Sequence, residues 1–179
     1  FDGGTRRGRD GAVAGAGVVF WRRSSHGPPR CIGRAVVALT QLCAAPAAEM
    51  QAARLALHLL ARIPAWVHRL DGPPTKRARL VGDCYPVIRY CASHARIRCM
   101  AHREPIDRAL AKALDRGWQL DWQAARLTHN GAAHELATAA AKWAAWLQER
   151  GFRTHPIWVE WGGRCERVPP GLQPPPDMT

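Results

Sequence analysis

The order in which short β-rich runs and helix-like stretches alternate constrains the fold of this chain most. Residues 14–21 and 31–39 are rich in Val, Ile and Ala and flank a turn-forming stretch, which predicts a β-hairpin. Helical and strand-like patterns then follow one another, as in an α/β domain whose mixed sheet is covered by helices. The expected helices span residues 46–62, 85–93, 106–116 and 132–150, and the expected strands after the hairpin span 77–81 and 118–122.

We expect one folded domain over residues 1–150 and an irregular tail or linker over 151–179. The length of 179 residues suits one domain with its own core. Pro and Gly return after residue 151, and no periodic pattern there is long enough to predict another core element. The sequence starts at Phe1 and reaches Asp2 at once, so we expect it to begin inside a longer protein, with its first strand truncated.

The charge balance favours an anionic partner. The chain has 26 Lys+Arg against 14 Asp+Glu, a net charge of +12, and its 47% of hydrophobic residues excludes a wholly disordered basic tail. Nearly all the basic residues are arginine, which suits bidentate contact with phosphate. No apolar run reaches the roughly 18 residues of a membrane span, and the start of the chain is unlike a signal peptide.

The cysteines and the missing targeting signals predict an intracellular protein that does not associate with a membrane. Six cysteines scattered through a chain of this length do not make a disulfide scaffold, so we expect reduced thiols. Work in the nucleus and work in the cytoplasm are equally compatible with the sequence.

Three acidic residues stand at the edges of predicted elements. Asp2 lies in a Gly-rich strand end, Glu49 in the first turn of the helix over 46–62, and Asp83 just after the strand over 77–81. Three carboxylates at one spot would repel one another unless a divalent cation neutralised them, and oxygen ligands favour Mg²⁺ or Mn²⁺. Each residue could also have a purely structural role: Asp2 as a turn residue, Glu49 as a partner of the helix dipole and Asp83 as an N-cap.

Four segments in the same order resemble the type-one ribonuclease H family, and its retroelement, plant-like or archaeal-like branches in particular. The resemblance covers residues 1–146. The short connection between Ser93 and Glu104 also favours a compact branch of the family. The segments are FDGGT at 1–5 with GAGVV at 15–19, AEMQA at 48–52, VGDC at 81–84 and NGAAHELA at 130–137.

The resemblance implies a ribonuclease H-like fold, with a five-stranded mixed sheet flanked by helices. It implies Mg²⁺-dependent hydrolysis of the RNA strand of RNA/DNA hybrids, with Asp2, Glu49 and Asp83 as metal ligands and Mn²⁺ as a second metal that could serve. It further implies a domain covalently joined to a reverse transcriptase in a retrotransposon polyprotein, monomeric when isolated. The alternative is a degenerate, non-catalytic nucleic-acid-binding domain of the same fold.

The sequence departs from the family at its fourth carboxylate, where this chain has His134. Imidazole is a poorer ligand for Mg²⁺ than for Mn²⁺, so we expect His134 near a second, weaker metal position. The alternatives for His134 are a contact with substrate phosphate and an inert residue at a helix start, and without the resemblance it would be taken as inert. Glu135 follows it, but one helical residue turns about 100° away and makes a doubtful substitute.

Basic residues in the segments 1–34 and 62–108 flank the hybrid-binding groove in the family, by the same resemblance. The candidate nucleic-acid contacts are Arg6, Arg7, Arg9, Arg89 and Asn130. Ordinary solvated arginine is the alternative for any one of them.

A second metal pattern has the spacing C-x-x-H, four residues, C-x-x-H. It is formed by Cys91, His94, Cys99 and His102, which could chelate zinc. The alternative is that the cysteines are small, buried or half-buried thiols.

Overall fold

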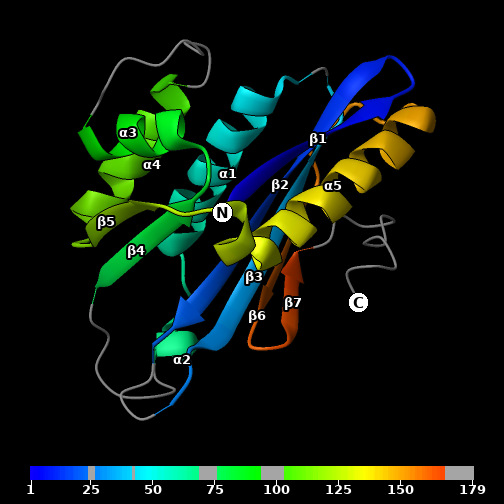
Figure 1. The fold of residues 1–179 in the computed structure, drawn as a ribbon. Coiled ribbons are helices and arrows are strands. Elements are labelled where there is room, and N and C mark those ends of the chain that lie inside the picture. The colour runs from blue at the N-terminus through cyan, green and yellow to red at the C-terminus, as the bar shows by residue number, and fades with distance from the viewer. Residues whose placement is uncertain (24–26, 42, 69–75, 94–102, 168–179) are drawn as a thin grey trace.

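The computed structural model describes residues 1–23, 27–41, 43–68, 76–93 and 103–167. These residues form an α/β structure with two sheets (Figure 1). Five antiparallel strands in the order β1-β2-β3-β6-β7 make the larger sheet, and β4 and β5 make a parallel pair. The strands are β1 (Asp2–Gly8), β2 (Gly11–Arg22), β3 (Arg30–Leu39), β4 (Arg77–Gly82), β5 (Gln119–Ala124), β6 (Ile157–Trp161) and β7 (Arg164–Arg167).

Four of the five helices in the described residues lie where helices were predicted, with ends that agree to within three residues, and the short helix Ala65–His68 was not predicted. Helix α1 begins near a proline in its first turn, where the missing N–H has no intrahelical partner to lose. The helices are α1 (Ala45–Leu60), α2 (Ala65–His68), α3 (Tyr85–Ser93), α4 (Arg103–Asp115) and α5 (Gly131–Glu149), with a 3₁₀ turn η3 (Leu127–His129) before α5.

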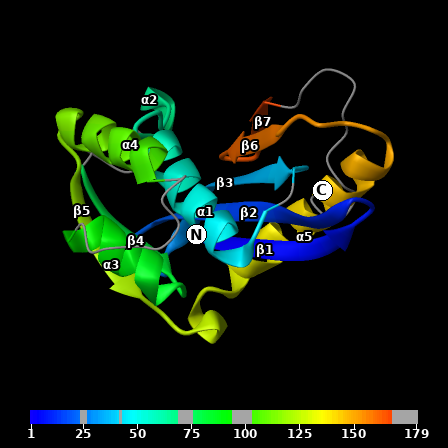
Figure 2. The ribbon, with the colours of Figure 1, turned by 90° about the horizontal axis from the view of Figure 1, so that it is seen from above.

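Helices α1 and α5 cover opposite faces of the larger sheet (Figure 2). Successive residues of a strand point to opposite faces, and the first residues of β1 show this. A Cβ atom added at Gly3 would meet the α1 backbone at Ala48, whereas one added at Gly4 would meet α5 at Ala137. Two separate hydrophobic clusters result, one on the α1 side and one under α5.

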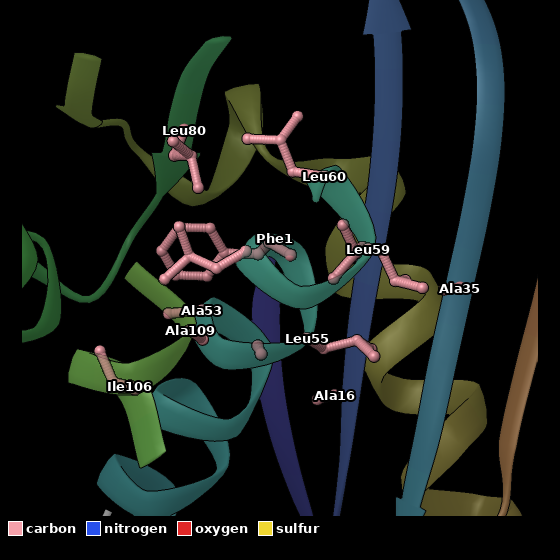
Figure 3. Close-up of a cluster of buried hydrophobic side chains, with 14 of the residues drawn as sticks. Phe1, Ala16, Ala35, Ala53, Leu55, Leu59, Leu60, Leu80, Ile106 and Ala109 are labelled. Atoms are coloured by element: carbon pink, nitrogen blue, oxygen red, sulfur yellow. The ribbon is translucent and has the colours of Figure 1, made fainter. Parts of the chain in front are cut away.

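The two sheets meet at Phe1. Its backbone nitrogen donates a hydrogen bond to the carbonyl of Val81 in β4 at 2.8 Å. Its ring makes an edge contact with Trp122 of β5, with the ring centroids 6.2 Å apart. Figure 3 shows the buried cluster in which Phe1 packs with Leu80 of β4 and Ala53 of α1. The core on the α1 side is therefore continuous across both sheets.

The prediction of a single five-stranded mixed sheet is therefore wrong, because the strands form one antiparallel sheet and one separate parallel pair. Strand β1 pairs with β2 from Asp2 to Gly8, and its link to β4 is the hydrogen bond from Phe1 to Val81. The parallel pair β4-β5 consequently forms its own sheet, and the fourth and fifth positions of the larger sheet are filled by β6 and β7 from the C-terminal part of the chain.

Residues 157–167 also differ from the expected irregular tail. Strand β6 pairs with β3 over Gly33–Val37 and forms a hairpin with β7. The turn contains Gly162 and Gly163, both with positive φ (54° and 82°), a backbone conformation that glycine adopts without strain. Trp158 and Trp161 are buried at 4% and 2% exposure, so this hairpin is part of the core.

Candidate metal centre

Three carboxylates from three elements converge at one end of β1. Asp2 opens β1, Glu49 lies in α1 and Asp83 directly follows β4. One ligand oxygen from each lies within 4.8 Å of the others, so the cluster could hold a metal ion. We call these three residues the carboxylate cluster.

Close packing of α1 on β1 brings Glu49 to Asp2. A Cβ atom at Gly3 would lie 2.3 Å from the backbone carbon of Ala48, an approach that only glycine permits. The Gly3 N–H also hydrogen-bonds the Glu49 carboxylate. Because α1 begins at Ala45, Glu49 belongs to the second turn and not to the first turn as expected, so a role as first-turn partner of the helix dipole does not apply.

Two carboxylate oxygens of the cluster are buried without a hydrogen-bond partner among the described residues. They are Oε2 of Glu49 and Oδ1 of Asp83. A buried anionic oxygen without a partner is unfavourable, and a divalent cation removes the penalty by accepting it as a ligand. The donor set is three carboxylates, which is hard-oxygen chemistry suited to Mg²⁺ or Mn²⁺. These residues therefore fit a divalent metal.

Burial and mutual repulsion resist full ionisation of the cluster. Burial, followed by the charges of Asp2 and Asp83, raises the pKa of Glu49 to about 8. Burial, followed by the charge of Asp83, also raises the pKa of Asp2, which is only 2% exposed. A hydrogen bond from His134 acts on Asp2 in the opposite direction. The ionised forms of Asp2 and Glu49 are therefore unfavourable in this site unless a positively charged group, such as a bound cation, lies beside them.

His134 lies beside the cluster. Its Nδ1 is 2.9 Å from Oδ2 of Asp2, and its side chain is 46% exposed while that of Asp2 is 3% exposed. Helix α5 carries it there by packing directly on β2, because a Cβ at Gly17 would lie 2.5 Å from the nitrogen of Ala137. Glu135 is exposed and is not one of the clustered acids.

Asn130 has a structural role that sequence reasoning missed. Its Nδ2 donates to the carbonyl of Phe1 at 2.7 Å, and the residue is 7% exposed. It sits at the N-cap position of α5 without a side-chain cap bond, since its amide is directed to Phe1 instead. This contact fixes the backbone immediately before Asp2. It spans 129 residues of sequence, so no local pattern could have revealed it.

The candidate arginines lie in two parts of the fold, β1 with the turn after it and α3. Arg6 and Arg7 are exposed in the second half of β1, and Arg6 lies about 13 Å from Asp2 at about 3.3 Å per strand residue. Arg9 is exposed in the turn between β1 and β2. Arg89 is exposed on α3, which starts two residues after Asp83, and its guanidinium lies 5.9 Å from the ring centre of Tyr85.

The expected zinc pattern falls largely outside the described residues. His94, Cys99 and His102 lie in the segment 94–102, which is not described. Cys91 is buried in α3, and its burial, followed by the charge of Asp107, raises the pKa of its thiol to about 12.

The structure thus defines an α/β protein with an acidic cluster able to hold a divalent metal. Comparisons of the chain with protein-family models, with curated proteins and with solved structures find no match. Among the described residues, no helix combines the length and the apolar character needed to cross a membrane.

Proposed function

We propose that this chain is a ribonuclease H-like domain that hydrolyses the RNA strand of RNA/DNA hybrids with Mg²⁺ or Mn²⁺. The observation that carries the proposal is the convergence of Asp2, Glu49 and Asp83 within 4.8 Å, from three elements that the sequence resemblance singled out. The net charge of +12 supports a polyanionic substrate. The fold family, the link to a reverse transcriptase in a retrotransposon polyprotein and an intracellular location belong to the same proposal.

In this proposal each residue of the site has a defined task. The three carboxylates hold the metal, which when bound activates water and stabilises the leaving oxygen. His134 holds the carboxylate of Asp2 through its Nδ1 contact, and Asn130 fixes the backbone before Asp2. Arg89 contacts substrate phosphate from α3, the helix that begins two residues after Asp83.

The second candidate is a non-catalytic nucleic-acid-binding domain of the same fold. It is favoured by His134, which occupies the place of a fourth acid and already hydrogen-bonds Asp2. A weaker second metal position would leave binding intact and remove hydrolysis.

Cleavage of labelled hybrid separates the two candidates. The protein is incubated with hybrid in Mg²⁺ and separately in Mn²⁺, alongside Asp83→Asn and a matched control, Asp121→Asn. Asp121 is an exposed acid on β5 that pairs with Arg79. Binding is measured in EDTA by fluorescence anisotropy. The enzyme proposal requires that Asp83→Asn abolishes cleavage and keeps binding, while Asp121→Asn cleaves as the unaltered protein does. Binding without cleavage in either metal would establish the non-catalytic domain instead.

A further inference from the structure

We propose that a basic cleft between α1 and α4 binds phosphate groups of a nucleic-acid strand, at a place separate from the carboxylate cluster. The cleft has a volume of about 170 Å³, which gives room for several water-sized spheres. Its lining residues are Arg54, His58, Pro105, Arg108, Ala109 and Lys112.

The cleft follows from how the two helices are spaced and packed. Arg54 and His58 are four residues apart on α1, and Arg108 and Lys112 are four residues apart on α4, so each pair lies on one helix face. Apolar contacts beneath them hold the helices together, and Figure 3 shows Ala53 of α1 near α4 in this cluster. Two basic pairs consequently share one opening.

The lining of the cleft is basic. It includes Arg54, Arg108 and Lys112, and no acidic residue is among the residues that line it. Arg108 pairs with Glu104 at 3.5 Å, but the two side chains are 71% and 79% exposed, where ion pairs are weak. Arg54 donates to Gln51, a neutral partner, at 3.3 Å. Cations gathered around one opening are stabilised by an anion, and arginine with lysine is the combination that suits phosphate.

The cleft and the carboxylate cluster lie on different sides of α1. At about 100° and 1.5 Å per residue, Arg54 is turned about 140° from Glu49 and His58 about 180°, some 8 Å and 14 Å further along the helix. A strand bound at the cluster must therefore pass over α1 to reach the cleft. The cleft would hold phosphates away from the scissile bond. Identifying that strand as part of an RNA/DNA hybrid rests on the proposed function, whereas the phosphate site itself does not.

The test measures binding in EDTA, where cleavage is absent. The double variant Arg108→Gln/Lys112→Gln removes two charges from the cleft. The matched control, Arg30→Gln/Arg164→Gln, removes two exposed charges at the start of β3 and in β7. Fluorescence anisotropy at several salt concentrations gives the affinity and the slope of log K against log salt. The probes are a short blunt hybrid, the same hybrid with a single-stranded extension, and inorganic phosphate as a competitor.

We expect the cleft variant to lower the salt slope by about 1.4–1.8, the amount that two lost phosphate contacts give, and the control to leave the slope nearly unchanged. The loss of affinity should be larger for the extended hybrid than for the blunt one. Equal losses of affinity in the two variants would show that only the net charge matters, and this would overturn the proposal. An unchanged affinity in both variants would overturn it as well. Inorganic phosphate that competes at the affinity of the strand would make the cleft a free-phosphate site. If the cleft variant loses affinity and the unaltered protein shows no cleavage in either metal, the phosphate site stands and the proposed enzymatic activity is wrong.

Discussion

Nδ1 of His134 lies 2.9 Å from Oδ2 of Asp2, although 132 residues separate the two along the chain. The contact joins a side chain that is 46% exposed to one that is 3% exposed. It lowers the pKa of Asp2 against the larger effect of burial. His134 therefore gives a buried carboxylate part of the stabilisation that a bound cation would otherwise provide.

Replacing His134 with aspartate should lower the stability of the metal-free protein and raise its affinity for Mg²⁺. His134→Asp places a fourth carboxylate beside Asp2, so the metal-free protein should lose about 1 kcal/mol and its Tm should fall by about 2–4 °C. The Mg²⁺ concentration that half-saturates the thermal shift should fall as well, because the added oxygen is a better ligand for Mg²⁺ than imidazole. Titration of Tm with Mg²⁺ measures both. His134→Asn is the neutral control, and identical titrations for the two variants would show that a carboxylate at position 134 does not reach the metal position.

Glu49 should make the metal-free protein less stable as the pH rises. Its pKa is raised from 4.5 to about 8 in the folded state, so the folded protein binds the proton more tightly than the unfolded chain does. Its contribution to stability is therefore present below pH 4.5 and is lost as the pH rises through 8.

Glu49→Gln removes that ionisation and should flatten the pH dependence of Tm between pH 5 and pH 8. At pH 8 the metal-free variant should be more stable than the unaltered protein by about 1 kcal/mol, after allowance for solvent screening. Mg²⁺ should raise the Tm of the unaltered protein and leave that of the variant almost unchanged. A variant whose Tm still falls with pH as steeply as before would show that Glu49 is not the group responsible.

The packing of α5 on β2 should depend on glycine at one position. In Gly17→Ala the new Cβ would lie 2.5 Å from the nitrogen of Ala137 and 2.6 Å from the carbonyl oxygen of Ala133, both backbone atoms that cannot move alone. We expect a loss of about 1–3 kcal/mol and, because α5 carries His134, a weaker Mg²⁺-dependent rise in Tm. Gly131→Ala is the matched control, since nothing lies within 4 Å of a Cβ there. Equal Tm values for the two alanine variants would refute this packing.

The acids of the site could be predicted because each follows a local signal. Asp2 precedes glycines, Glu49 lies near the start of a periodic helix and Asp83 ends an alternating strand. The prediction that these acids converge rested on the order of the segments that resemble the family, because local patterns do not encode which elements pack together. The bond from Asn130 to Phe1 and the separation of β4-β5 from the larger sheet depend on such long-range contacts and were missed for that reason.

The hairpin of β6 and β7 was missed for a different reason. Strand β6 is five residues long and β7 is four, so neither contains enough alternation to stand out among the neighbouring Pro and Gly residues. The Gly162-Gly163 pair between two short runs was the available signal for a hairpin. Because the segment was interpreted as a tail from its Pro and Gly content, its two buried tryptophans, Trp158 and Trp161, were not predicted as core residues.

The buried tryptophan of β6 should therefore contribute to the stability of the whole domain. Trp161 is 2% exposed, packs on the ring of Phe20 with centroids 4.9 Å apart, and fills the space beside Gly33. Trp161→Ala should cost about 3–5 kcal/mol and lower Tm by roughly 10 °C. Trp21→Ala makes the same change at a side chain that is 56% exposed and should shift Tm by only a degree or two. Thermal unfolding followed by circular dichroism compares them, and an unchanged Tm for Trp161→Ala would mean that residues 157–167 do not belong to the core.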